Sequence, residues 1–412
     1  MENTSPERLA QELLAHCLES RPWPEHLLKA LLAQGGDQAL FRVVVERLAD
    51  LFEPRLCGVY AGLFAEVIAR RIPGLHADHL LARYERIRLP RVLDRDPNSI
   101  ENVFVLSRVT LGADVAVTSV ILDAAKQRFP NATIWFTGPK KSWELFAADA
   151  RLRHLSIAYG RGGTIDDRLS VWPPLRAAVG LPRSIIIDPD SRLTQLGLLP
   201  ICQEEDYYFF ESRSYGAGGG GPLSYLTERW VAETFGVDRA RAYISTGLEA
   251  AGFASTVSLG VGENPSKRVP DPFEEELLRR LPRPILIDKG AGGEEAERVE
   301  RAVAKAGGEG VVMWDGSFAG FAEHIRRSKL YVGYDSAGGH VAAACGVPML
   351  SIFAGAVCER MYERWLPGHR GACFVIRPEK MSLEKLLSTF EEQVRRISLS
   401  SDLREADPAS QT

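Results

Sequence analysis

Residues 329–356, KLYVGYDSAGGHVAAACGVPMLSIFAGA, decide the fold that this sequence predicts. They begin with an apolar run typical of a buried strand and continue through a polar turn at 333–336. A segment of helix-forming composition follows, and Gly346 and Pro348 end it before a second apolar strand at 349–353. Strand, turn, helix and strand form the unit from which open parallel sheets are built, so we expect an α/β domain here.

The turn lies where ligands of open parallel sheets bind, at the carboxyl end of a strand. Free N–H groups and the helix dipole at the start of the following helix suit a phosphate group. Gly338 and Gly339 would let such a ligand approach the backbone closely, because glycine has no side chain. An ordinary strand–helix–strand unit with a glycine turn gives the same pattern, and that alternative stays open here.

The pattern D-S-x-G-x-H is formed by Asp335, Ser336 and His340, and the small-residue helix after it ends in Gly-Val-Pro at 346–348. This pattern resembles the nucleotide-sugar signature of the heptosyltransferases, glycosyltransferase family 9. Members of that family have the GT-B fold of two Rossmann-like domains. The resemblance covers residues 100–400 in broad outline and is strongest at 103–130 and 323–356.

The expected architecture is therefore an α/β protein with two Rossmann-like domains (GT-B), preceded by an all-helical N-terminal domain. We expect four parts along the chain: a helical domain, an acceptor-side Rossmann-like domain, a nucleotide-sugar-binding Rossmann-like domain, and the end of a C-terminal helix with a disordered tail. Their predicted bounds are 1–90, 100–248, 249–385 and 386–412, with the tail beginning at 398.

Composition places the chain among ordinary globular proteins. Its 412 residues are enough for two or three domains, and 45% hydrophobic with 25% charged residues is typical of a packed core under a solvated surface. A net charge of −4 gives no reason to expect a nucleic-acid partner. The six cysteines lack C-x-x-C spacing, so we expect reduced thiols and no zinc site.

Targeting signals are not found. The N-terminal residues MENTSPERLAQELL lack a basic start before an apolar core, which speaks against a signal peptide. No apolar run reaches the roughly 18 residues that a membrane span needs. We therefore expect a cytoplasmic protein, with peripheral contact to the inner membrane face left open, although no basic amphipathic helix argues for it.

The first 90 residues carry apolar residues at helical spacing. Ser5 and Pro6 form a typical helix start, and the stripe recurs as far as Ile68. Such stripes indicate the core of a helical domain more readily than a partner surface. The same domain is nevertheless a candidate for self-association or for contact with an acceptor.

A second resemblance lies in the first α/β domain. After the strand at 103–106, the family has Leu-Gly-Asp, and its Asp is the proposed general base for the acceptor hydroxyl. Here the loop reads LGAD, ending at Asp114, so Ala113 is inserted. One extra residue turns a helical side chain by roughly 100°. Asp114 is thus either the base or an acid favoured by a helix N-terminus.

Two further acids, Asp188 and Asp190, lie at the end of a strong strand at 185–188. They are reserve candidates for the base, although turn formation explains them at least as well. The glycine cluster at 216–221 lacks the spacing of a phosphate loop, so we expect a flexible loop there.

The third part opens with a strand at 254–259 and a glycine-containing loop that ends in Lys267 and Arg268. Backbone N–H groups and two cations suit a diphosphate, and a solvated basic loop is the alternative. This element resembles the Lys-Arg-Trp-Pro element of the family, with Val269 in place of Trp. The resemblance implies that Lys267 contacts the donor phosphate and that Arg268 supports it.

Glu294 and Glu295 follow the strand at 284–288 and a glycine-rich turn. A carboxylate there can accept hydrogen bonds from both ribose hydroxyls. The family has acids in this loop, which implies ribose binding by Glu294 or Glu295. Acids in the first turn of a helix are an equally good explanation.

The resemblance implies an inverting, metal-independent glycosyltransferase without a cofactor. Asp114 would take the acceptor proton, while Lys267, the Ser336 hydroxyl and the backbone at 336–339 would stabilise the leaving diphosphate, with a hydrogen bond from His340. An ADP-linked heptose is the expected donor. The acceptor class stays open between a glycan such as the lipopolysaccharide core, a lipid-linked molecule and a protein side chain. A catalytically degenerate binding protein, and an epimerase or hydrolase, are the alternatives.

Overall fold

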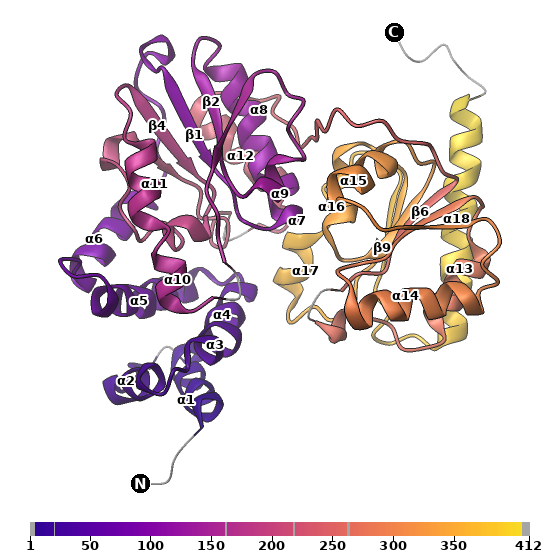
Figure 1. Ribbon diagram of the computed structural model, residues 1–412, viewed down its shortest axis with the longest axis horizontal. Coiled ribbons are helices and arrows are strands. Elements are labelled where there is room, and N and C mark those ends of the chain that lie inside the picture. The colour runs from indigo at the N-terminus through magenta and orange to yellow at the C-terminus, as the bar shows by residue number, and fades with distance from the viewer. Residues whose placement is uncertain (1–4, 20, 161–162, 217–218, 262–263, 406–412) are drawn as a thin grey trace.

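The structure is a computed structural model that describes residues 5–19, 21–160, 163–216, 219–261 and 264–405. A helical N-terminal segment comes first, and two α/β domains follow, each built around a parallel sheet (Figure 1). The predicted fold class is therefore confirmed. No helix in the described part of the chain is long and apolar enough to cross a membrane.

The N-terminal segment consists of short amphipathic helices. Ser5 caps the first of them by accepting a hydrogen bond from the Arg8 N–H at 3.4 Å. The elements are α1 (Pro6–Leu18), α2 (Glu25–Ala33), α3 (Asp37–Ala39), the π-helical turn η1 (Leu40–Val45), α4 (Glu46–Asp50), α5 (Pro54–Arg71) and α6 (Ala77–Ile87). Their buried leucines and valines pack in one cluster with residues of the first sheet, so this segment shares its core with the first α/β domain.

The first sheet has the strand order β3-β2-β1-β4-β5, and all neighbouring strands are parallel. Its strands are β1 (Asn102–Leu106), β2 (Thr133–Gly138), β3 (Leu152–Ser156), β4 (Ser184–Asp188) and β5 (Tyr207–Phe209). Because alternate side chains of a strand point to opposite faces, Val103 and Val105 pack under α8 and α12, whereas Phe104 and Leu106 face the helical segment.

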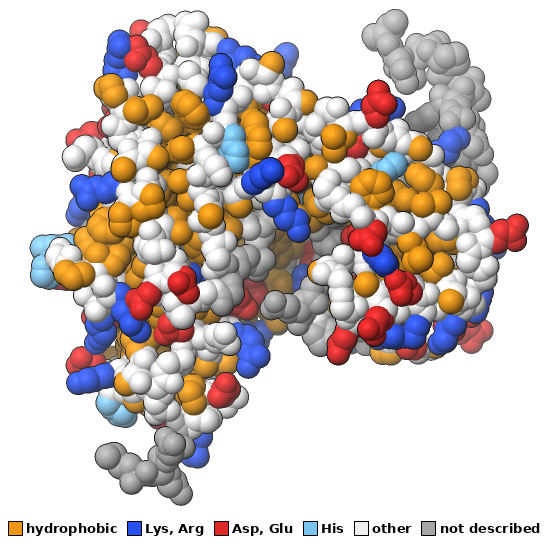
Figure 2. Space-filling model, viewed as in Figure 1, with side chains coloured by type: hydrophobic (Ala, Val, Ile, Leu, Met, Phe, Trp, Pro, Cys, Tyr) orange, Lys and Arg blue, Asp and Glu red, His pale blue; other side chains and the backbone are white. Residues whose placement is uncertain are grey.

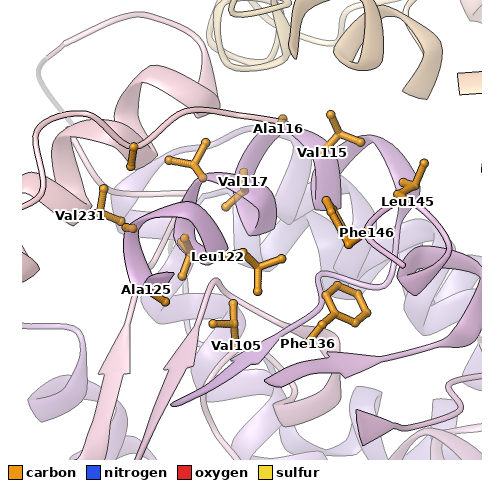
Figure 3. Packing of buried hydrophobic residues seen from close by; sticks show 14 of the residues in the cluster. Val105, Val115, Ala116, Val117, Leu122, Ala125, Phe136, Leu145, Phe146 and Val231 are labelled. Carbon is orange, nitrogen blue, oxygen red and sulfur yellow. The ribbon is translucent and has the colours of Figure 1, made fainter. Parts of the chain in front are cut away.

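Helices cover both faces of that sheet. They are α7 (Leu111–Ala113), the π-helical turn η3 (Asp114–Thr118), α8 (Ser119–Arg128), α9 (Lys140–Trp143), α10 (Ile165–Leu169), α11 (Trp172–Val179) and α12 (Leu223–Phe235). Short 3-10 turns lie at η2 (Pro97–Ser99), η4 (Arg192–Thr194) and η5 (Glu204–Asp206). Figure 3 shows how Val117, Leu122 and Val231 from these helices gather with Val105 and Phe136 from the strands.

The second sheet has the order β11-β10-β9-β6-β7-β8 and is also parallel throughout. Its strands are β6 (Ser255–Ser258), β7 (Ile285–Asp288), β8 (Val311–Trp314), β9 (Tyr331–Tyr334), β10 (Met349–Ile352) and β11 (Cys373–Ile376). The order places the first strand of the domain, β6, beside β9, which is the strand that carries the D-S-x-G-x-H turn. This is the topological switch point where doubly wound sheets bind ligands.

The helices of the second domain are α13 (Phe273–Arg280), α14 (Gly293–Lys305), α15 (Phe318–Arg326), α16 (Ala337–Ala344), α17 (Glu359–Trp365) and α18 (Leu383–Glu405), with a 3-10 turn η6 (Pro265–Lys267). The sequence predicted a disordered tail from residue 398, but α18 continues to Glu405. The rest of the predicted tail, 406–412, lies outside the described residues. Buried residues of α15 and α16 belong to the same cluster as those of α8 and α12, so an apolar contact joins the two α/β domains.

Candidate functional site

The two sequence motifs that resemble the transferase family meet between the domains. The helix α16 of the second domain packs against α7 and η3 of the first. Gly112 makes this close approach possible, because a Cβ atom at that position would lie 3.1 Å from His340 Cδ2 and 3.3 Å from the Ala337 Cα. The loop that carries Asp114 and the helix that follows Asp335 are therefore in contact across the two domains.

Lys267 and Asp335 form an ion pair at the carboxyl edge of the second sheet. The Lys267 Nζ donates to Asp335 Oδ2 at 2.6 Å, and the two side chains are 22% and 9% exposed. Lys267 comes from the loop after β6, whereas Asp335 directly follows β9, the neighbouring strand. Adjacent parallel strands thus place a cation and an acid together at the carboxyl edge of the sheet.

Gly355 supports the loop that carries Lys267 through a close backbone contact. The loop after β10 contains Gly355 in the left-handed region, with φ +72°. A Cβ atom there would lie 2.5 Å from the carbonyl oxygen of Ser266, so only glycine allows the loop 264–267 to rest on this backbone. The position of the Lys267 ammonium therefore depends on a glycine in a different loop.

His340 is buried in the first turns of α16, with 7% of its surface exposed. Burial lowers the pKa of its imidazole, the nearby Asp335 acts in the opposite direction, and Lys267 lowers it further. Its ring lies 5.8 Å from that of Trp365 in an edge-on arrangement. A neutral imidazole can donate one hydrogen bond, which is the role that the resemblance implies for His340.

Packing within the second domain explains why glycine stands at Gly338 and Gly339, independently of any ligand. A Cβ atom on Gly338 would clash with the Tyr331 hydroxyl, and one on Gly339 would touch Met349 at 3.5 Å. Tyr331 packs under the start of α16, where its hydroxyl lies 3.4 Å from Ser336 Oγ. In the described part of the chain no side chain caps α16, so its N-terminal N–H groups suit an anion.

Arg268 is tied to acids of its own domain. Its guanidinium donates to Glu274 at 3.1 Å and also pairs with Asp271. Glu274 is 2% exposed and accepts a further hydrogen bond from the Tyr334 hydroxyl. Arg268 therefore braces the loop that carries Lys267, and its predicted role in donor binding stays a prediction.

The two predicted ribose ligands differ in their surroundings. Glu295 accepts hydrogen bonds from the backbone N–H groups of Val261 at 2.7 Å and Ala291 at 2.8 Å, which ties the loop after β6 to the loop after β7. Glu294 is exposed in the first turn of α14. Neither position tests ribose binding, which stays a prediction. Gly262 and Glu263, in the predicted phosphate loop, and 217–218, in the glycine cluster, lie outside the described residues.

Asp114 is fully buried and contacts its own loop. Its carboxylate accepts hydrogen bonds from the Ser107 hydroxyl, the Arg108 N–H and the Thr118 hydroxyl, each at 2.7 Å. Burial raises its pKa, and these hydrogen bonds oppose the shift. The π-helical turn Asp114–Thr118 follows Ala113 directly, the residue by which this loop differs from the family pattern. The structure thus shows that Asp114 orders its own loop, and the role of base stays a prediction.

The two reserve candidates for the base, Asp188 and Asp190, are also held by hydrogen bonds and an ion pair. Asp188 is fully buried, accepts from the Ser191 N–H and the Thr194 and Tyr207 hydroxyls, and has its pKa raised to about 6, chiefly by burial. Asp190 has a left-handed backbone with φ +65° and pairs with Arg213. Both acids order the turns after β4, in keeping with the interpretation as turn-formers.

Two carboxyl groups that feel charges of another domain were not singled out from the sequence. Asp288, at the end of β7, has its pKa raised by burial, and Lys141 on α9 of the first domain acts on it in the opposite direction. The Asp50 carboxyl, at the end of α4, is influenced by Arg213 and Lys267. Figure 2 shows acidic and basic side chains close together where the two domains meet on the drawn face. No local sequence signal marks these residues, because tertiary contacts bring them together.

Comparisons with known structures identify the fold. The glycosyl transferase family 9 protein from Veillonella parvula superposes with a TM-score of 0.52 at 14% identity, over 72% of this chain and 97% of that chain. The E. coli heptosyltransferase WaaC with ADP superposes with a TM-score of 0.52 at 15% identity, over 71% of this chain and 99% of that chain. The E. coli ADP-heptose lps heptosyltransferase II superposes with a TM-score of 0.50 at 15% identity, over 73% of this chain and 99% of that chain.

The chain has the fold of the family 9 glycosyltransferases. This confirms the GT-B arrangement that the D-S-x-G-x-H turn predicted. The match leaves more than a quarter of this chain without a counterpart in the WaaC structure, since 71% of it is covered. Neither a protein-family model nor a curated protein matches the sequence.

Proposed function

We propose that this protein is an inverting glycosyltransferase that moves a sugar from a nucleoside-diphosphate donor to a hydroxyl acceptor. The observation that carries the proposal is the Lys267–Asp335 ion pair, 2.6 Å between Nζ and Oδ2, at the switch point of the second sheet. A cation beside an uncapped helix N-terminus suits the negative charge of a diphosphate.

In this proposal the second domain binds the donor. The Lys267 ammonium, the Ser336 hydroxyl and the N–H groups that begin α16 neutralise the charge that develops on the leaving diphosphate. His340, neutral through burial, donates its N–H to a phosphate oxygen. Glu295 or Glu294 accepts from the ribose hydroxyls, and Arg268 keeps the Lys267 loop in place.

The donor that the proposal favours is an ADP-linked heptose. Its support is the likeness in fold to E. coli WaaC, whose structures hold ADP and ADP-2-deoxy-2-fluoro heptose. The acceptor is a hydroxyl of a glycan, a lipid-linked molecule or a protein. Metal-independent inversion follows from the resemblance of the two motifs to those of the family.

A second candidate function is binding of a nucleotide sugar or a partner without transfer. The observation that favours it is the state of Asp114, which is 0% exposed and accepts three hydrogen bonds from its own surroundings. A carboxylate in that state does not contact an acceptor hydroxyl. If transfer occurs, either the Asp114 loop rearranges or a different acid takes the proton.

A thermal-shift panel of ADP, UDP, GDP, CDP and their sugars tests the donor site. A ligand at 100 times its dissociation constant adds about 2.7 kcal/mol to stability. The proposal expects a shift with ADP compounds that Lys267→Ala abolishes and Lys305→Ala keeps, because Lys305 pairs with Glu275 on α13, at 58% exposure. Selective response to another base would replace the heptose donor, and no shift with any nucleotide would favour the partner-binding alternative.

A further inference from the structure

The outer strand of the second sheet, β8 (Val311–Trp314), has an apolar edge. Among the described strands it pairs with β7 alone. Its side chains include Val312, which is 49% exposed, and Met313, which is 43% exposed. Proteins commonly protect such an edge with a lysine, a proline or a bulge, and the strand VVMW contains neither a charge nor a proline. This edge is therefore open to pairing with another strand.

The hydrogen bonds to β7 show which backbone groups of β8 point outward. The Gly310 carbonyl accepts from the Ile285 N–H at 2.9 Å, and the Trp314 carbonyl accepts from the Lys289 N–H at 3.0 Å. Because successive residues of a parallel strand turn their backbone groups to opposite sides, Met313 directs its N–H and its carbonyl away from β7. A second strand could therefore add to β8 through the Met313 backbone.

Charges of opposite sign lie at the two ends of β8. Arg283 lies against its start, because a Cβ atom on Gly310 would be 3.4 Å from the Arg283 Cδ. The Arg283 guanidinium donates to the Glu309 carbonyl, and no carboxylate of the described residues pairs with it. Asp315 directly follows the end of β8, and its side chain is 80% exposed and lies 3.3 Å from the Lys289 ammonium. A cation at one end and an acid at the other match themselves when two copies of the strand run antiparallel.

We propose that two copies of this chain associate by antiparallel pairing of their β8 strands about a two-fold axis at Met313. Each Met313 exchanges backbone hydrogen bonds with the partner's Met313. Val312 then lies opposite the partner's Trp314, which covers both apolar side chains. Asp315 lies beside the partner's Arg283, and the two-fold axis repeats this ion pair. The inference goes beyond the proposed function and does not depend on it.

Charge favours this register over the neighbouring one. An axis at Val312 would also bring outward backbone groups face to face, but it would place Glu309 opposite the partner's Asp315. Like charges directly opposite each other on paired strands are destabilising. An axis at Met313 places Glu309 opposite the partner's Ser317 instead, so that no two acids meet.

The size of the contact sets its strength. Pairing of one short strand buries far less than the roughly 1,600 Å² of a standard interface, so the dimer is expected to dissociate reversibly, with a dissociation constant on the order of 10 to 100 μM. The two second sheets join into one continuous sheet. Because the paired strands are antiparallel, the carboxyl edges of the two sheets, where the predicted donor sites lie, face opposite ways.

Sedimentation velocity of the full-length chain tests the association at protein concentrations from about 1 to about 300 μM. The wild type is expected to change from monomer to dimer over this range. Met313→Lys sets two ammonium groups opposite each other at the axis and should raise the dissociation constant about tenfold or more. Met381→Lys makes the same change at another exposed methionine of the second domain, 38% exposed, and should dimerise as the wild type does.

A charge exchange tests the register. Asp315→Arg brings a second cation to the partner's Arg283 and should weaken the dimer. Adding Arg283→Asp restores an ion pair of exchanged signs across the axis and should recover the wild-type dissociation constant. A merely structural role of either residue would not be rescued by the second change, and melting temperatures of the single and double variants measure such a role separately.

Each outcome decides the inference. A wild type that stays monomeric over the whole range would overturn it. A dimer that Met313→Lys leaves as strong as the wild type would show that association uses another surface and would overturn it as well. A dimer that Asp315→Arg weakens, and that the added Arg283→Asp does not restore, would contradict the ion pair between the two copies and with it the proposed register.

Discussion

The Nζ of Lys267 lies 2.6 Å from Oδ2 of Asp335, across the junction of β6 and β9. A donor diphosphate would share this ammonium with Asp335. Lys267→Met removes the cation and should weaken ADP binding by about 10- to 100-fold, the value of one or two charge-assisted hydrogen bonds. Asp335→Asn removes a negative charge beside the phosphates and should weaken it far less.

Calorimetric titration with ADP measures both variants against the wild type, with Lys305→Ala as the control at an exposed ion pair. Equal losses in the two variants would show that the ion pair serves the fold and not the ligand.

Asp114 is expected to matter for stability before it matters for turnover. In Asp114→Ala the Ser107 hydroxyl, the Arg108 N–H and the Thr118 hydroxyl lose their acceptor in a buried place. We expect the free energy of unfolding to fall by about 3 kcal/mol or more, measured by chemical denaturation. A variant of unchanged stability that binds ADP but has lost turnover would instead support Asp114 as the base.

Asp188 should make stability depend on pH. Burial raises its pKa in the folded state to about 6, whereas the usual value is 3.8, so between these values the folded protein holds a proton that the unfolded chain has released. Stability therefore increases as the pH falls through 6 towards 4, and above 6 the contribution is lost.

The difference in unfolding free energy between the wild type and Asp188→Asn should change by about 2 kcal/mol from pH 7 to pH 4.5, in favour of the wild type at low pH. Urea denaturation at several pH values measures it. A difference that is constant with pH would show that the Asp188 carboxyl titrates normally.

Gly355 is expected to control the donor site from a distance. Gly355→Ala and Gly346→Ala both place a side chain at a left-handed position, with φ +72° and +68°, but only the first meets the Ser266 carbonyl. Gly346→Ala should cost about 1 kcal/mol and leave ADP affinity unchanged.

Gly355→Ala should lower ADP affinity as well, because the loop of Lys267 must move away from the added methyl group. Thermal melts and ADP titration of the two variants provide the measurement. Equal ADP affinities would mean that Gly355 does not position Lys267.

Local patterns were sufficient for the fold. The apolar runs at 103–106 and 134–136 lie within β1 and β2, and the D-S-x-G-x-H turn lies between β9 and α16 as predicted. These elements are fixed by periodicity, turn residues and helix ends, which act over a few residues. The likeness of both motifs to one family supplied the pairing of the two domains.

Local sequence patterns could not predict the directions in which the side chains of the site point. Asp114 turns towards Ser107 because a π-helical turn follows the inserted Ala113, and Gly338 faces Tyr331 because that ring fills the space under α16. The turn after α4 follows a helical stripe that reads as core, and no local pattern could predict its contact with α17. Such contacts join residues far apart in sequence.

The central claim is that the second sheet binds a nucleoside diphosphate at its switch point. A crystal structure of the full-length protein with ADP tests it most directly. The account predicts phosphate oxygens within hydrogen-bonding distance of the Lys267 Nζ and of the N–H groups that begin α16, with the adenosine beside Glu295. Density for ADP elsewhere, with the Lys267–Asp335 pair unchanged, would contradict it.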